Sequence, residues 1–128
     1  MTNVDLVKQV YFHLATGNVP AVLALFDPAI QWHECKGMPF INGNGIFTGP
    51  EAVVANVFMQ LPVSYDGFNV AVTEIFGADD KVVMVGYYQG TNRATGNDFK
   101  ANATHVWTVK NGKMSHFFQA VDTAATMR

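Results

Sequence analysis

The feature that most constrains the fold is a change in hydrophobic period near the middle of the chain. Up to Pro62, apolar residues recur every three or four positions, whereas from Phe68 onward they alternate with more polar residues. Strands are predicted over 68–76 and 82–90, then up to Val109 and from 114 to 122. Asn111-Gly112 predicts a tight hairpin between the last two strands. We therefore expect four consecutive strands in an antiparallel meander.

The first half of the chain predicts three helices. Their apolar faces are Val7, Val10, Tyr11 and Leu14 in the first, Val22, Leu25 and Phe26 in the second, and Val54, Val57, Phe58 and Leu61 in the third. A capping residue precedes each helix, namely Thr2, Asn18 and Thr48, the last in a capping box with Glu51. Between the second and third helices we expect a short strand over 29–34 and a glycine-rich loop over 37–49.

Three helices followed by a meander predict an α+β fold in which the helices cover one face of a curved sheet and enclose a pocket. With 128 residues, 49% of them hydrophobic and 14% charged, we expect a single domain over 1–128 with one core. The formal net charge is −2, and no two Lys or Arg residues are adjacent. Neither nucleic acid nor a membrane surface is expected as a partner.

Cys35 is the only cysteine, which excludes a disulfide within the chain and favours a reducing compartment. The apolar stretch after Met1 is interrupted by Asp5, Lys8 and His13, so it predicts neither a signal peptide nor a membrane span. We expect a cytoplasmic protein.

Several short motifs, in this order and spacing, carry a family resemblance. They are Leu25-Phe26-Asp27-Pro28 leading into Trp32-His33-Glu34, Phe47-Thr48-Gly49-Pro50-Glu51-Ala52-Val53, Thr95-Gly96, His105-Val106-Trp107, Asn111-Gly112-Lys113-Met114 and Val121-Asp122. The chain resembles the SnoaL-like branch of the nuclear transport factor 2-like superfamily, which includes ketosteroid isomerases and polyketide cyclases. The resemblance implies a cystatin-like cone but no particular reaction.

The resemblance also implies candidate catalytic residues. His33 falls where ketosteroid isomerases carry the carboxylate base, and His105 falls where they carry a protonated acid. Asp122 is similar to the aspartate that serves as acid/base in SnoaL-like cyclases. Val10 falls at the position of the oxyanion tyrosine, so the resemblance does not support steroid isomerase activity.

Strand parity puts His105 on one face with Trp107, and Asp122 on one face with Phe118, and we expect both faces to line the pocket, as His33 does if residues 31 and 33 point inward. Further pocket residues are then Gln31, Tyr88, Trp107, Phe118, Phe58 and Phe40, although parity alone does not tell whether Tyr87 or Tyr88 faces inward. We expect His33 or Asp122 to remove a proton from a bound carbonyl compound while His105 donates to the oxygen that becomes negative.

Other interpretations of the same residues stay open. His105 could be a wall residue that only bonds a neighbour, and Asp122 could be solvated at a frayed strand end. The whole domain could be a non-catalytic binder, or an interaction module with a filled core. No cofactor is expected, since the glycines lack the G-x-G-x-x-G spacing. Adjacent His33, Glu34 and Cys35 cannot converge on one metal ion.

The convex face of the sheet should be partly apolar. Ile75 is one hydrophobic residue expected there. Residues 82–85 are all hydrophobic, so whichever alternate pair points outward adds apolar side chains to this face. An antiparallel sheet with such a face usually buries it, which predicts a homodimer through the convex face.

Overall fold

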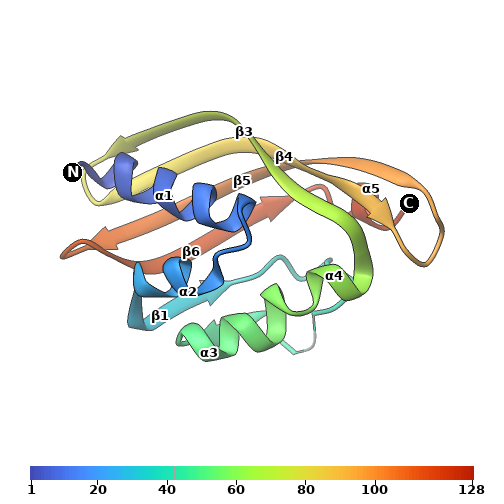
Figure 1. Cartoon of the computed structure of the whole chain (residues 1–128), viewed down its shortest axis with the longest axis horizontal. Helices are drawn as coiled ribbons and strands as arrows, with labels where there is room; N and C mark the ends of the chain where they lie inside the picture. The colour runs from blue at the N-terminus through green and yellow to red at the C-terminus, as the bar shows by residue number, and fades with distance from the viewer. Residues whose placement is uncertain (42) are drawn as a thin grey trace.

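The computed structural model describes residues 1–41 and 43–128. Its elements are α1 (Asn3–Ala15), α2 (Val19–Ala24), β1 (Phe26–His33), β2 (Ile46–Thr48), α3 (Pro50–Val53), the π-helical turn η1 (Val54–Phe58), α4 (Leu61–Ser64), β3 (Tyr65–Ala78), β4 (Lys81–Asn92), β5 (Asp98–Lys110), β6 (Lys113–Val121) and α5 (Thr123–Thr126). Helices α1, α2 and α3 lie over one face of the sheet (Figure 1). We call this helix-covered face the inner face, and the opposite face the outer face.

The sheet confirms the predicted meander. Its six strands lie in the order β2-β1-β6-β5-β4-β3, and each neighbouring pair from β3 to β6 is antiparallel. At the predicted hairpin Asn111 and Gly112 have φ of 52° and 73°, the left-handed conformation that such a tight turn requires. Strand β1 then pairs parallel with β6, and β2 adds an antiparallel edge. The α+β prediction, with a mainly antiparallel sheet, is confirmed.

The first two helices begin as the sequence predicts. Thr2 and Asp5 form a reciprocal capping box, in which the Thr2 side chain accepts from the Asp5 amide and the Asp5 carboxylate accepts from the Thr2 amide. The Asn18 side chain accepts from the Ala21 amide at the start of α2. Local side-chain chemistry is therefore enough to place these two ends.

The third predicted helix differs from its prediction in two ways. No side chain caps α3, because Gly49 at φ 88° is the residue that precedes it, and Thr48 lies in β2 with its hydroxyl directed to Gln31. The predicted helix is also divided into α3, η1 and α4, so the helix count exceeds three. The short C-terminal α5 was not predicted.

The core lies between the helices and the inner face. One cluster joins α1, α2 and η1 to the middle of the sheet through Val7, Val10, Val22, Val57, Trp32 and Trp107, among others. A second cluster, around Tyr65, Tyr88 and Phe99, lies at the end of the sheet near α4. Among the described residues, no helix has the length and apolar character needed to cross a membrane.

Candidate functional site

A cavity of about 540 Å³ lies between the inner face and the helices. Its wall is mainly apolar and includes the aromatic side chains of Trp32, Phe58, Phe68, Trp107 and Phe117. Asp66 and Arg93, exposed and 3.7 Å apart, also line it and form an ion pair. The cavity therefore suits a small and largely apolar molecule.

Six side chains on the cavity wall form a chain of hydrogen bonds that begins at Trp107. The Trp107 indole Nε1 donates to the Tyr11 hydroxyl at 2.8 Å, and the Tyr11 oxygen lies 2.7 Å from His105 Nδ1. His105 Nε2 contacts the Tyr88 hydroxyl, which in turn donates to Gln119 Oε1. Helix α1 and strands β4, β5 and β6 thus contribute to one connected network.

The network ends at Glu34, directly after β1. Gln119 Nε2 donates to Glu34 Oε2, and the Trp32 indole Nε1 donates to Glu34 Oε1 at 2.8 Å. An ionised carboxylate only accepts, which fixes the direction of the preceding bonds. Because the Tyr88 proton goes to Gln119, the Tyr88 oxygen accepts from His105 Nε2. His105 Nδ1 then accepts from Tyr11.

Burial controls the electrostatics of this network. Glu34 is 7% exposed, and its desolvation raises the carboxyl pKa to about 7 against the opposing hydrogen bonds from Trp32 and Gln119. Desolvation lowers the pKa of His105 to about 3, so its imidazole is neutral at physiological pH. Within 1–41 and 43–128 the only ion pair joins Arg93 to Asp66, so no cation offsets the Glu34 charge.

Four of the residues predicted from sequence line this cavity: His105, Tyr88, Trp107 and Phe58. Tyr88 is the inward member of the 87–88 pair, since its side chain is 5% exposed. Both ring nitrogens of His105 are occupied by tyrosine hydroxyls. Direct donation from His105 to a ligand, as the sequence suggested, would therefore require one of these bonds to break.

The inward orientation expected for Gln31 and His33 is wrong. Trp32 and Glu34 point to the inner face instead, and His33 lines a separate shallow hollow on the outer face. The physical reason is that Trp32, 4% exposed, is the larger apolar side chain and belongs to the core. Gln31 points outward with His33, and the Thr48 hydroxyl donates to its side-chain oxygen.

Phe118 also lies on the outer face, 55% exposed, whereas its neighbour Phe117 is buried on the cavity wall. Strand β6 changes register near its start, between the pairs Thr108–His116 and Val109–Met114. Such an irregularity puts Met114 and Phe117, three residues apart, on the same face. Strict alternation of side chains along β6 therefore assigns Phe118 to the wrong face of the sheet.

Asp122 and Phe40 are likewise outside the cavity wall. The exposed Asp122 carboxylate caps α5 by accepting from the Ala125 amide at 3.3 Å. The chain has already left the sheet at this point, so strand parity no longer applies. Phe40 packs beside both core clusters rather than on the cavity wall.

Sequence reasoning missed Glu34, Tyr11 and Gln119. The alternation Ile30, Trp32, Glu34 was a usable signal, because the two apolar members mark the buried face and carry Glu34 with them. The resemblance pointed to Val10, but Tyr11, the next residue, brings its hydroxyl to the cavity. Among the residues that the structure describes, no three His, Cys, Asp or Glu side chains are placed to hold a metal ion.

Comparison with known proteins agrees with this fold. A nuclear transport factor 2-like protein from Burkholderia thailandensis E264 is 34% identical, with a TM-score of 0.92 over 100% of this chain and 98% of that one. A second, from Burkholderia pseudomallei K96243, is 26% identical, with a TM-score of 0.88 over 100% and 97%. TerC, co-crystallized with polyporic acid, is 22% identical, with a TM-score of 0.86 over 98% and 95%, and shows the shared fold alone.

None of the curated proteins matches the chain significantly. The sequence model of the SnoaL-like domain matches residues 7–117. That match covers most of the helices and all but the end of the sheet, and it confirms the resemblance carried by the sequence motifs. The chain therefore belongs to the SnoaL-like domain family.

Proposed function

We propose that this cavity performs acid/base chemistry on a small, largely apolar carbonyl or hydroxy compound, with Glu34 taking up and returning the proton. The observation that carries the proposal is a buried carboxylate in an aromatic cavity with a pKa of about 7. Such a group is present in both protonation states near neutral pH, which is the condition for efficient general acid/base catalysis. Trp32 and Gln119 each occupy only one oxygen of the carboxylate, so lone pairs remain for a substrate.

In the proposed step a C–H bond beside the substrate's carbonyl breaks, and its electron pair forms a C=C bond as the C=O π bond opens. The proton goes to the Glu34 carboxylate, and the π electron pair moves onto the carbonyl oxygen. Return of the proton to a different carbon gives isomerisation, and its return to a departing hydroxyl gives dehydration. TerC, which has this fold, was co-crystallized with polyporic acid, and that supports an organic molecule as the ligand.

His105 is proposed as a positioning residue in this chemistry. Its ring joins the Tyr11 and Tyr88 hydroxyls, and through Tyr88 it fixes the Gln119 amide that donates to Glu34. His33 and Asp122 lie outside the cavity wall, so the proposal gives them no proton transfer there.

The test is deuterium exchange into 2-tetralone, a compact ketone with acidic hydrogens beside its carbonyl, followed by NMR in D₂O. We expect the wild-type protein to accelerate exchange and Glu34→Gln to lower the catalysed rate by a factor of about 10² or more. The matched control is His33→Gln, which changes a titratable side chain on the outer face. It should leave the rate within about twofold, since His33 does not line the cavity.

Exchange that survives Glu34→Gln would refute the role of Glu34. A wild-type protein that is stabilised by 2-tetralone but catalyses no exchange would instead indicate a non-catalytic ligand binder. One observation favours this second function: every polar group of the network already has a protein partner.

A further inference from the structure

The negative charge of Glu34 has no partner of opposite sign. The Trp32 indole and the Gln119 amide that donate to its carboxylate are both neutral. Neutral donors leave part of the desolvation cost of a carboxylate uncompensated, and a buried charge without a counter-ion is rare in folded proteins. Because Glu34 contributes to the cavity wall, a cation that entered the cavity would offset this cost.

The other charged side chains on the cavity wall are those of Asp66 and Arg93, which form an ion pair with each other. These two side chains are 72% and 51% exposed, whereas Glu34 is buried. Among the described residues that line the cavity, Glu34 is therefore the charged one without a counter-ion. The electrostatics of the interior favour a positively charged ligand over a negatively charged one.

Aromatic rings form much of the wall beside this charge. The Trp32 ring stands nearly perpendicular to the rings of Phe58 and Trp107, with centroids 5.6 and 5.8 Å away. Rings at right angles present their faces in different directions, and Phe68 adds another ring to the wall. The face of an aromatic ring is negative, so several such rings around one space suit an alkylated ammonium group.

We propose that the cavity binds a small organic ammonium ion, with Glu34 as the counter-ion and the aromatic rings of the wall in contact with its alkyl groups. The attraction between the two charges needs no hydrogen bond to a Glu34 oxygen, so a tertiary or quaternary amine qualifies. The volume of about 540 Å³ suits such a molecule. The inference goes beyond the proposed function and requires no proton transfer to or from the ligand.

The experiment compares phenyltrimethylammonium with tert-butylbenzene, in which carbon replaces the charged nitrogen and the shape is kept. Trp32 and Trp107, the two tryptophans of the chain, both line the cavity, so their fluorescence reports binding of either probe. At about pH 8 we expect Glu34→Gln to raise the Kd of the cation about tenfold or more, because the counter-ion is lost. The Kd of the hydrocarbon should stay within about twofold, which shows that the cavity is intact.

The pH dependence of the wild-type protein gives a second readout, which requires no variant. A cation favours the ionised carboxylate, so its affinity should rise about tenfold per pH unit below the Glu34 pKa of about 7 and become constant above it. Binding at about pH 7 should release roughly half a proton per cation. Calorimetry in buffers of different ionisation enthalpy measures this release.

Other titratable groups near Glu34 do not explain such a dependence. Burial lowers the pKa of His105 to about 3 and raises the pKa of the three cavity tyrosines, so all four stay neutral over this range. These tyrosines are Tyr11, Tyr65 and Tyr88. Any contribution from Cys35, Asp66 or Arg93 would persist in Glu34→Gln. The inference expects both the pH dependence and the proton release to be absent in that variant.

The matched control is Glu51→Gln, the same substitution on α3, where the side chain is exposed and outside the cavity wall. It should change neither Kd. Cation binding that Glu34→Gln leaves unchanged, or that Asp66→Asn weakens instead, would overturn the inference. Equal weakening of both probes by Glu34→Gln would assign Glu34 a packing role and overturn it too.

A wild-type protein that binds no cation, or binds it equally at every pH, would likewise overturn the inference. The proposed function fails separately from it. Cation binding that depends on Glu34, without catalysed exchange into 2-tetralone, would refute only the acid/base function. Catalysed exchange that depends on Glu34, without cation binding, would refute only the ammonium site.

Discussion

At the scale of single residues, Glu34 and His105 impose opposite pH dependences on stability. The folded-state pKa of Glu34, about 7, exceeds its ordinary value of 4.5, so between these values the folded chain holds a proton that the unfolded chain has released. This contribution lowers stability as pH rises through the window. For His105 the folded-state pKa of about 3 lies below 6.5, so stability rises with pH between these values.

Glu34→Gln should therefore expose the His105 contribution. Relative to wild type, the free energy of unfolding of the variant should increase by about 1.4 kcal/mol for each pH unit between pH 4.5 and 7. Urea denaturation at half-unit pH steps measures this difference, and the slope is insensitive to any constant offset from the new amide. Parallel stability curves for the two proteins would show that Glu34 is already ionised throughout this range.

Also at residue scale, the sequence identifies the chemical types in the site better than their orientations. The alternation of β5, which is long and regular there, correctly places His105 and Trp107 on the cavity side, whereas alternation alone did not decide between Tyr87 and Tyr88 in β4. The resemblance at a single position favours His33 over Glu34, whereas the burial of Trp32 decides the opposite. A one-residue error in a strand reverses the face of every side chain, so this error removed the carboxylate from the predicted site.

At the scale of elements, Gly86 permits the bend of the sheet. A Cβ built on Gly86 would lie 2.0 Å from the Ala71 carbonyl oxygen, where β3 is irregular between Val72 and Glu74. The obstacle is backbone rather than a flexible side chain, so the two strands cannot both keep their positions. Strands β3 and β4 are long, curved neighbours in the ribbon of Figure 1.

Gly86→Ala should therefore destabilise the protein by about 3 kcal/mol, measured by urea denaturation. The matched control is Gly96→Ala at an exposed turn, where φ is +74° and no atom lies within 4 Å of the position that a Cβ would take. That variant should cost about 1 kcal/mol, from the backbone conformation alone. If Gly86→Ala lost no more stability than Gly96→Ala, that result would contradict the close approach of β3 and β4.

Element ends show where local signals are sufficient. Thr2 and Asn18 start their helices as predicted, since a cap needs only neighbouring residues. The predicted Thr48–Glu51 capping box is wrong because Thr48 belongs to β2, where it pairs with Gln31 of β1, seventeen residues away. Long-range pairing overrides a local cap in that case.

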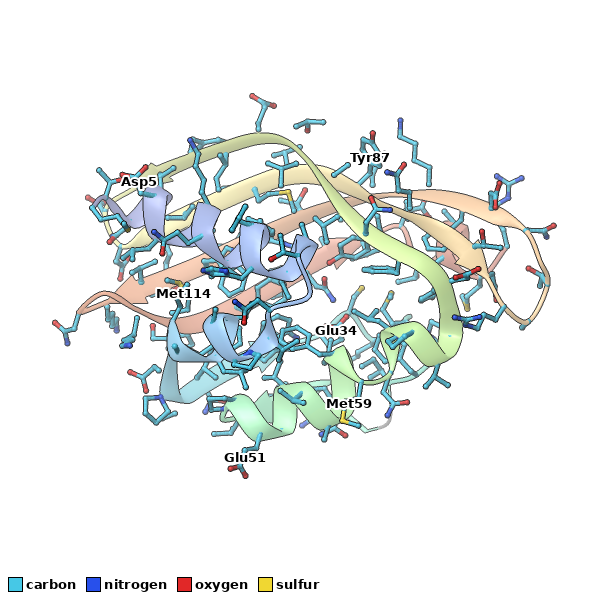
Figure 2. All side chains as sticks on the ribbon, viewed as in Figure 1. Asp5, Glu34, Glu51, Met59, Tyr87 and Met114 are labelled. Atoms are coloured by element: carbon cyan, nitrogen blue, oxygen red, sulfur yellow. The ribbon has the colours of Figure 1, made fainter. Side chains whose placement is uncertain are left out.

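At the scale of the whole molecule, Glu34 lies in the middle of the fold, whereas Glu51 and Met59 point away from it on the helical side (Figure 2). The outer face carries one largely apolar row, to which Phe76 contributes in place of the expected Ile75, since Ile75 packs against the core on the inner face. The strand pairings place Ile46, His33, Phe118, Val106, Val83 and Phe76 in one row across all six strands. Ile46, Phe118 and Phe76 in this row are 43%, 55% and 53% exposed.

This row supports the proposed homodimer through the outer face, since apolar side chains spread over a whole sheet are usually covered. Phe118→Glu should convert a dimer into a monomer in sedimentation at micromolar concentration, because it would bury two charges in the interface. The control is Phe12→Glu on α1, where the side chain is 63% exposed away from this face. A monomeric wild-type protein would remove the prediction.

By itself, the sequence determined the meander, the hairpin at Asn111-Gly112, the first two helix caps and the family, since hydrophobic period, turn residues and caps act over a few residues. Only the tertiary structure decided which face of β1 is buried. It also decided that Phe117 lines the cavity instead of Phe118, because of the irregularity in β6, and that Asp122 lies beyond the end of the sheet. It also joined Tyr11, His105 and Glu34 through side chains from separate elements. These outcomes depend on competition for one shared core, and no single segment carries the information to settle that competition.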